Sequence, residues 1–557
     1  MIPVSVQRRA QNLILFTVCS ITLIVSPWLT IDAVNLPKFL ILGTFSMTVV
    51  GTLAPYAKQI SNSGARVTLN AVLFFIFSLV VVCFASGAGI WTQVYGTRGR
   101  NTGLITYICL SLLMVAVAFV SNPSFAKKLI WMLIATGATN TTYGLVQWLG
   151  FDPIKWSDIY GPIVGTLGNP NFTSAHLGIA GLAALPLIVD KACRLRVRLV
   201  LFTYLCLSLF VITKTNSSQG LLIFLLGATF VVYFRYFTTA RALFRRAYCL
   251  LAASALIIGI FGLLNKGPLG FLLYQYTTAY RGDYWRAGWK MTIDNPMFGV
   301  GLDSYGDWYR FSRTEIAALR RGPDYISDSA HNVFLDISSN GGFFLLIGYL
   351  SILVLISYSG WRILRKLRDF DAIGVGLVVT WLAYICQSVV SINQLALATW
   401  GWIIGGTIVG YDLYKESTRA SKVEIERTQS PGKVTAAVVL TSFMGCIAGF
   451  VVAMWPMSLD MNFRNALESG DALKIEAAAK QFPKSGYYLA FASQLFLENK
   501  LEDKALELAT LSIESNPRHF NSWKSFVSNP KLSQSEKASA IAKMRELDPF
   551  NNTLGKK

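Results

Sequence analysis

Thirteen apolar runs, most of them about 20 residues long, dominate the chain and are separated by short loops. A helix of that length crosses the roughly 30 Å of hydrocarbon in a bilayer. Because every backbone polar group must be satisfied inside a membrane, repeated runs of this length predict transmembrane helices. The predicted spans are residues 12–29, 37–54, 67–87, 103–120, 128–149, 172–190, 198–213, 218–236, 247–264, 342–359, 373–391, 395–412 and 434–455.

Composition supports the same class of protein. Hydrophobic residues make up 53% of the 557-residue chain, charged residues 14%, and the mean hydropathy is +0.47. A soluble chain of this length carries more charge. The eight cysteines lie in or beside the apolar runs without a C-x-x-C spacing, which favours packing over a disulfide framework or a zinc site. We predict an all-α polytopic membrane protein of about 12 to 13 transmembrane helices, the first of them uncleaved.

The distribution of Lys and Arg predicts the orientation of the spans. With a cytoplasmic N-terminus, the inner segments hold 23 basic residues. The short outer loops hold only Lys38, Arg98, Arg100, Lys155 and Lys214. This asymmetry follows the positive-inside rule and accounts for the net charge of +20 without nucleic acid as a partner. We therefore expect a multi-pass membrane protein with residues 265–341 and 457–557 outside the cytoplasm.

The same topology divides the chain into six parts, of which residues 457–557 are the last. This last part is polar and helix-forming. Its prolines at 483, 517 and 549 lie 34 and 32 residues apart, a spacing that resembles tetratricopeptide repeats. An unrelated array of helical hairpins is the alternative, and either could dock a protein partner. The predicted parts are an N-terminal transmembrane bundle (1–264), a large outer loop with short helices (265–341), a second transmembrane part (342–412), a cytoplasmic basic linker (413–433), an additional transmembrane helix (434–456) and an outer helical-repeat domain (457–557).

Residues 281–342 form a polar stretch that is poorly suited to hydrocarbon. It is therefore a candidate for the catalytic part of the chain. His331 stands just before an apolar helix and could take a proton from a hydroxyl near neutral pH, although a structural histidine is the alternative. Arg281 and Arg286 lie five apart in one predicted helix and cannot share a face well. One of them is therefore expected to point to the site and the other to the interface.

Three other predicted outer loops carry unusual polar residues. In residues 95–103, Arg98 and Arg100 could grip a phosphate with their planar guanidinium groups, or they could anchor the helix that follows at the membrane interface. Residues 165–171 read as a turn rich in Gly and Asn, and residues 214–220 include Gln219. A metal site was also considered, but no D-x-D spacing recurs among Asp294, Asp303, Asp307, Asp324 and Asp328.

Three ordered motifs within residues 95–410 resemble the O-antigen ligase and polymerase family, which includes bacterial O-oligosaccharyltransferases. The first is the Gly-Thr-x-Gly-Asn-Pro-Asn run that ends at Asn171. The second is Arg281-x3-Trp-Arg-Ala with the Asn-Pro-Met-Phe-Gly-Val-Gly run that follows it. The third is Ala-His331-Asn332 with its Gly-Gly pair ahead of a span.

The resemblance implies a glycosyltransferase of the GT-C kind in the bacterial inner membrane that uses neither a metal nor a nucleotide sugar. Such enzymes move a glycan from an undecaprenyl diphosphate carrier to an acceptor hydroxyl on the outer face, here on a lipid, a protein or a wall polymer. The implied catalytic residues are His331, as base or acceptor-orienting group, and Arg281, which would bind the diphosphate. The expected substrate-binding residues are Arg98, Arg100, Arg286, Asn169, Asn171, Gln219 and Asn332.

One departure from the family pattern concerns the loop before the eighth predicted span. Many relatives carry Ser-Arg-Gly where this chain has Gln219 between Ser and Gly, so an arginine elsewhere would have to hold the diphosphate. No carboxylate pair of the glycosidase kind is evident, and we expect a single displacement with inversion. A polymerase of the same family and a non-catalytic transporter or scaffold are the alternatives. The near absence of ionisable residues within the spans counts against a transporter.

Overall fold

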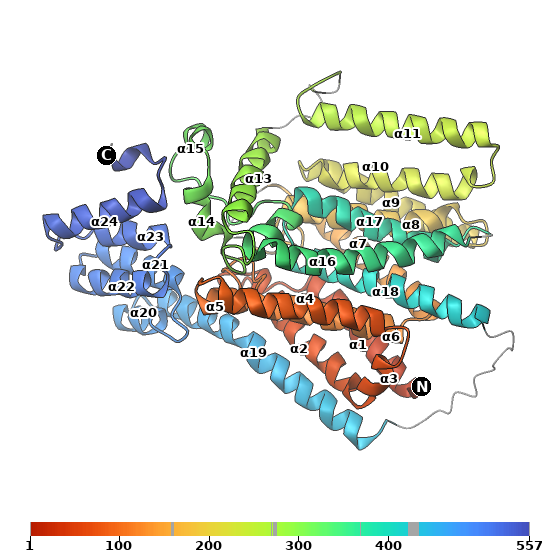
Figure 1. The fold of residues 1–557 in the computed structure, drawn as a ribbon, viewed down its shortest axis with the longest axis horizontal. Coiled ribbons are helices and arrows are strands. Elements are labelled where there is room, and N and C mark those ends of the chain that lie inside the picture. The colour runs from red at the N-terminus through yellow and green to blue at the C-terminus, as the bar shows by residue number, and fades with distance from the viewer. Residues whose placement is uncertain are drawn as a thin grey trace.

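The structure is a computed structural model that describes residues 2–156, 161–268, 270, 276–367, 369–420 and 434–555, with the backbone alone at 263, 276–278 and 417–420. The described residues are 76% helical, and no strand occurs among them. This confirms the predicted all-α class. Figure 1 shows the arrangement of the helices in the protein. Its apolar helices make it a multi-pass membrane protein.

Nine helices of the described ranges are long and apolar enough to cross a membrane. They are α2 (Asn35–Leu53), α4 (Arg66–Ala85), α8 (Pro170–Val189), α9 (Leu195–Lys214), α10 (Gln219–Val232), α11 (Ala242–Leu263), α16 (Val333–Arg365), α17 (Ala372–Val390) and α19 (Ala436–Ser469). The remaining predicted spans also fall on helices, namely α1 (Val4–Leu23), α6 (Leu104–Val120), α7 (Pro123–Trp148) and α18 (Leu395–Ala420). The count of thirteen spans stays a prediction. The first helix begins at Val4, eight residues before the predicted run, and its first turns include Arg8 and Arg9.

Small residues bring α19 and α2 into close contact. A Cβ added to Gly449 would lie 2.3 Å from the carbonyl oxygen of Gly43, and one added to Gly51 would lie 2.2 Å from that of Thr441. Helices in membranes often pack through small residues in this way, because backbones can then approach closely. The last apolar helix is therefore fixed against the second, although about 400 residues separate them.

The helix α19 continues without a break through Pro456 and ends at Gly470, whose positive φ of 65° suits a glycine C-cap. The boundary predicted at residue 456 therefore lies inside one helix. Beyond it follow α20 (Ala472–Ala479), α21 (Gly486–Glu498), α22 (Glu502–Ser515), α23 (Phe520–Val527) and α24 (Gln534–Leu547). The helices α20, α22 and α24 each end a few residues before one of the three spaced prolines, and their assignment as tetratricopeptide-like stays a prediction.

The short helices of the polar stretch lie at the same end of the molecule as these C-terminal helices (Figure 1). They are α13 (Tyr276–Asp294), α14 (Tyr305–Ser312) and α15 (Glu315–Arg321). A further short helix, α5 (Ile90–Tyr95), leads into the loop that carries Arg98 and Arg100. The N-terminus lies toward the opposite end of the bundle. The candidate residues of the loops are thus gathered on one face.

Candidate functional site

Arg100 is buried between its own loop, residues 96–103, and the polar stretch. Its guanidinium group lies 3.2 Å from Asp303 and 3.7 Å from Asp336, and it donates a hydrogen bond of 2.6 Å to the carbonyl oxygen of Asp328. Burial by itself would lower the pKa of Arg100, but these three carboxylates raise it above its ordinary value. Arg100 therefore ties residues 96–103 to the polar stretch as a permanently charged group.

The carboxylate of Asp303 completes this link. It accepts hydrogen bonds from the backbone N–H of Thr97 (2.7 Å) and the hydroxyl of Thr102 (2.9 Å). The Thr97 hydroxyl also donates to the Asp303 carbonyl oxygen. A buried carboxylate is stable when hydrogen bonds and an opposite charge satisfy it, and Asp303 has both. The two loops consequently form one rigid unit around Arg100.

His331 sits immediately before the N-cap of α16. Its backbone has a φ of 50°, in the left-handed region that non-glycine residues seldom occupy. The next residue, Asn332, holds this geometry, because its side chain accepts hydrogen bonds from the N–H groups of Phe334 and Leu335. Strained backbone of this kind is frequent at functional sites. Asn332 thus acts as a helix cap that presents His331.

The imidazole of His331 lies in a positively charged, largely dry environment. Its ring stacks on Tyr284 with centroids 5.3 Å apart. Burial lowers the pKa of His331 to about 3, and the guanidinium groups of Arg281, Arg100 and Arg321 contribute to the decrease. The ring is therefore neutral near pH 7, so one of its nitrogens can accept a hydrogen bond from a hydroxyl.

Arg281 and Arg321 are half-buried guanidinium groups without an acidic partner. Neither forms an ion pair with a carboxylate in the part of the chain that the structure describes. Arg321 lies 4.0 Å from the ring centroid of Tyr280 and donates a hydrogen bond to the Tyr284 hydroxyl. Burial also lowers the pKa of Arg281. A partly buried cation without a counter-ion is free to pair with an anion. Both guanidinium groups lie close enough to His331 to lower its pKa.

Arg321 is the residue that the sequence analysis missed. It is the second of two adjacent arginines at the end of α15, a position that also suits a helix C-terminus and therefore drew no attention. The following Gly322 has a φ of 88°, which allows the chain to turn back toward His331. The only signal in the sequence was the Arg-Arg-Gly run itself.

Two of the predicted substrate-binding arginines are engaged elsewhere. Arg98 lies 3.3 Å from Asp460 of α19 and 4.5 Å from the ring centroid of Tyr487. Arg286 is exposed and lies 3.0 Å from Asp283. Neither is among the charges that act on His331. Arg98 therefore joins the loop to the C-terminal helices, and its part in substrate binding, like that of Arg286, remains a prediction.

The residues of the earlier motif form a second cluster. The side chain of Asn169 caps α8 by accepting from the backbone N–H of Asn171, and the Asn171 side chain accepts from the Ser217 hydroxyl at 2.8 Å. Nearby, Gln219 is buried, and neither its amide oxygen nor its amide nitrogen has a hydrogen-bond partner among the described residues. Buried amides are usually paired, so Gln219 keeps hydrogen-bonding capacity that its neighbours do not use.

The five aspartates considered for a metal are dispersed. Asp294 pairs with Lys290, Asp303 with Arg100, and Asp307 accepts from Asn516. Within the described ranges, no three His, Cys, Asp or Glu side chains gather as a metal-binding set. The charge at this site is instead supplied by guanidinium groups.

A comparison with protein families finds a match, which covers part of this site. Residues 201–350 match the model of the family described as O-Antigen ligase. The match supports the O-antigen ligase family. The matched segment contains Arg281, Arg321 and His331, whereas Arg100 and the C-terminal helices lie outside it. No curated protein matches the chain.

Proposed function

We propose that the protein transfers a glycan from a polyprenyl diphosphate carrier to an acceptor hydroxyl on the outer face of the membrane. The observation that carries this proposal is the pair of unpaired guanidinium groups, Arg281 and Arg321, beside the neutral imidazole of His331. A diphosphate would supply the missing counter-charge. The match of this segment to the O-antigen ligase family supports the same chemistry.

The transfer step follows from these groups. The acceptor oxygen attacks the anomeric carbon while the bond from that carbon to the phosphate oxygen breaks, and the electron pair leaves with the diphosphate. Arg281 and Arg321 stabilise the charge that develops there, because fixed donors in a water-poor site need little reorganisation. His331 accepts the hydrogen bond, and then the proton, of the attacking hydroxyl. Attack opposite the leaving group predicts inversion.

The substrate itself would strengthen His331 as a base. The three arginines lower the pKa of His331 in the free protein, and a bound diphosphate would screen their charge. The proton affinity of the imidazole would then rise only when the donor is in place. This order protects the site against protonation before the donor binds.

The pH dependence of the reaction tests this coupling. In the free enzyme, the pKa of His331 is about 3, below its ordinary value, so the ring stays neutral from pH 8 to pH 5. We therefore expect kcat/KM, which reports the free enzyme, to lack an acid limb near pH 6.5. The limb in kcat, which reports the donor complex, should lie at higher pH than the limb in kcat/KM. Identical limbs near pH 6.5 in both profiles would contradict the proposed environment of His331.

Arginine substitutions test the proposed function directly. In liposomes with a labelled lipid-linked glycan, we expect Arg281→Ala and Arg321→Ala each to reduce kcat by about 10²–10³-fold, the usual loss when one fixed donor is removed. Lys290→Ala is the matched control, since Lys290 lies on the same helix as Arg281, is exposed and pairs with Asp294. Full transfer by both Arg281→Ala and Arg321→Ala would refute the proposal.

A polymerase of the same family is the second candidate, with another lipid-linked glycan as acceptor. The C-terminal helices pack on the polar stretch and could present a protein or polymer acceptor, which favours a ligase or oligosaccharyltransferase. The glycan products of cells that lack the protein distinguish the two candidates. A ligase is identified if a lipid, protein or wall polymer loses its glycan, and a polymerase is identified if the glycan chains become shorter.

A further inference from the structure

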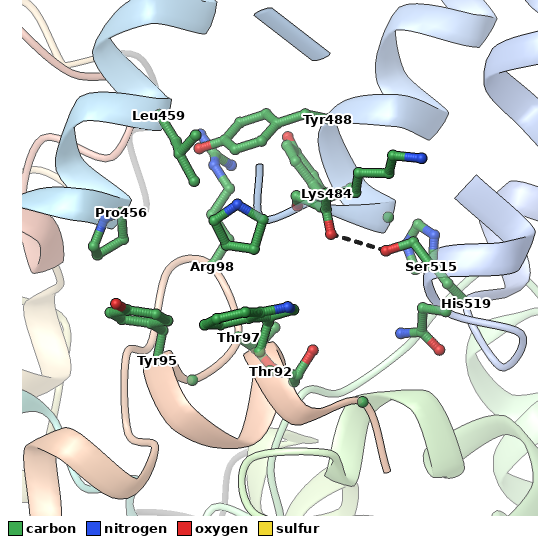
Figure 2. Close-up of a pocket in the computed structure, with 18 of the residues that line it drawn as sticks. Thr92, Tyr95, Thr97, Arg98, Pro456, Leu459, Lys484, Tyr488, Ser515 and His519 are labelled. Atoms are coloured by element: carbon green, nitrogen blue, oxygen red, sulfur yellow. Dashed lines mark hydrogen bonds between the residues drawn. The ribbon is translucent and has the colours of Figure 1, made fainter. Parts of the chain in front are cut away.

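A cavity of about 370 Å³ lies where α5, α19 and the C-terminal helices meet (Figure 2). Its size falls in the range of small-molecule pockets. Tyr95 and Thr97 border it on one side, Pro456 and Leu459 on another, and Ser515 and His519 on a third. Parts of the chain that are far apart in the sequence therefore surround it.

We propose that this cavity binds a sugar unit of the acceptor glycan. The proposal deepens the transfer function. The identity of the sugar as part of an acceptor rests on that function, whereas the binding of a saccharide rests on the residues that line the cavity.

One wall is an aromatic surface. The rings of Trp91 and Tyr95 are inclined by only 20°, with centroids 6.3 Å apart, and Trp455 also lines the cavity. Trp91 is held edge-to-face by Phe482, at 5.1 Å between centroids. The C–H groups on one face of a pyranose carry a small positive charge and pack against the electron-rich face of such rings. Two nearly parallel rings form a platform of suitable width.

Another part of the lining offers hydrogen-bonding groups. Asp307 accepts from the side chain of Asn516 through one carboxylate oxygen, at 2.8 Å, so its other oxygen remains available. His519 is bonded to Ser522 through Nδ1, which leaves Nε2 for a ligand. The His519 side chain is half-buried and also lines the cavity. Sugar hydroxyls donate and accept, and therefore need this mixture of groups.

The combination of walls argues against other occupants. An acyl chain would cover the carboxylate of Asp307 with hydrocarbon, and its one hydrogen bond, from Asn516, would leave most of its charge unsatisfied. A phosphate would meet that same negative charge, since of the two lining cations Arg98 is already paired with Asp460 and Lys484 is exposed to solvent. A neutral, polyhydroxylated ring satisfies both walls. A lipid headgroup remains as an outcome of the experiment.

The cavity adjoins the transfer site through shared loops. Thr97 and Asn101 line it, and the same loop carries the buried Arg100. Gly306 and Asp307 line it from the polar stretch, directly after Asp303. Most of the lining lies outside the segment that matches the family, in residues 36–101 and 455–519. The cavity is thus a place where this chain could select its own acceptor.

Direct binding tests the proposal without any transfer reaction. We would titrate the purified full-length protein with fluorescent trisaccharides of glucose, galactose, mannose and N-acetylglucosamine. We expect saturable binding of at least one, and a loss of affinity of at least tenfold in Trp91→Ala and in Asp307→Ala. Trp289→Ala is the control, because Trp289 is 53% exposed on α13 and does not line the cavity. His331→Ala should bind like the wild type, which separates this inference from the transfer function.

Three results would overturn the inference. They are no binding of any of the four sugars, equal binding by Trp91→Ala and Trp289→Ala, and loss of a co-purified phospholipid from Trp91→Ala with sugar binding unchanged. If Trp91→Ala unfolds, Asp307→Ala decides alone, judged by its tenfold loss against Trp289→Ala.

Discussion

His331→Ala should reduce glycan transfer by about 10²–10⁴-fold, the usual contribution of a positioned acid or base. The neutral imidazole lies among three arginines at the start of α16, where a hydroxyl can donate to it while a diphosphate binds beside it. The measurement is single-turnover transfer in liposomes from a labelled lipid-linked donor. Donor binding, measured separately, should change little, because Arg281 and Arg321 remain.

A second substitution separates the two roles that His331 could play. In His331→Gln the side chain still accepts a hydrogen bond but does not take up a proton near neutral pH. If this variant keeps more than a tenth of the wild-type rate, then His331 chiefly orients the hydroxyl. Wild-type activity in His331→Ala would remove His331 from the mechanism, whatever the glutamine variant does.

Asp548→Ala should loosen the C-terminal helices from the polar stretch by about 3–5 kcal/mol, the usual cost of leaving a buried charge without its partner. Asp548 is 1% exposed and accepts from two buried arginines, at 3.0 Å from Arg310 and 2.7 Å from Arg313. Arg310 also stacks at 4.1 Å over Phe520. Hydrogen exchange in α14 and α23 should quicken markedly, because both helices border this contact.

The control for this change is Asp503→Ala, since the Asp503 side chain is 83% exposed and its pair with Lys531 is worth little. Replacing Arg313 by leucine in the Asp548→Ala background should recover part of the protection, because it removes one of the stranded charges. Unchanged exchange in Asp548→Ala would mean that the C-terminal helices dock by other contacts. Transfer activity should fall along with docking if these helices position the loops of the site.

Much of the fold could be read from the sequence, because hydrocarbon imposes one simple requirement. A helix that crosses it needs a long apolar run, and every predicted run lies on a helix of the structure. The ends of the helices were less predictable. The first begins at Val4, and α19 passes through Pro456, because capping and packing rather than hydropathy set these ends.

The candidate site was only partly predictable. His331 and Arg281 were named from their motifs, and the structure brings them together with Arg100. Arg321 could not be found, because nothing in its neighbours reveals that α15 turns back toward His331. Asp307 and His519, which both line the cavity, could not be found for a related reason, because they lie about 200 residues apart in the sequence.

Arg98 and Arg100 show where the sequence by itself stops. Two residues apart in one loop, they have the same charge and similar neighbours, so the sequence determined a cationic loop and an all-α membrane chain around it. The tertiary structure decided their separate partners. Arg100 is buried against Asp303 and Asp336, and Arg98 is paired with an aspartate 362 residues away. The reason is that the interactions of a charged group depend on the atoms within a few ångströms of it, and the order of residues along the chain does not specify those neighbours.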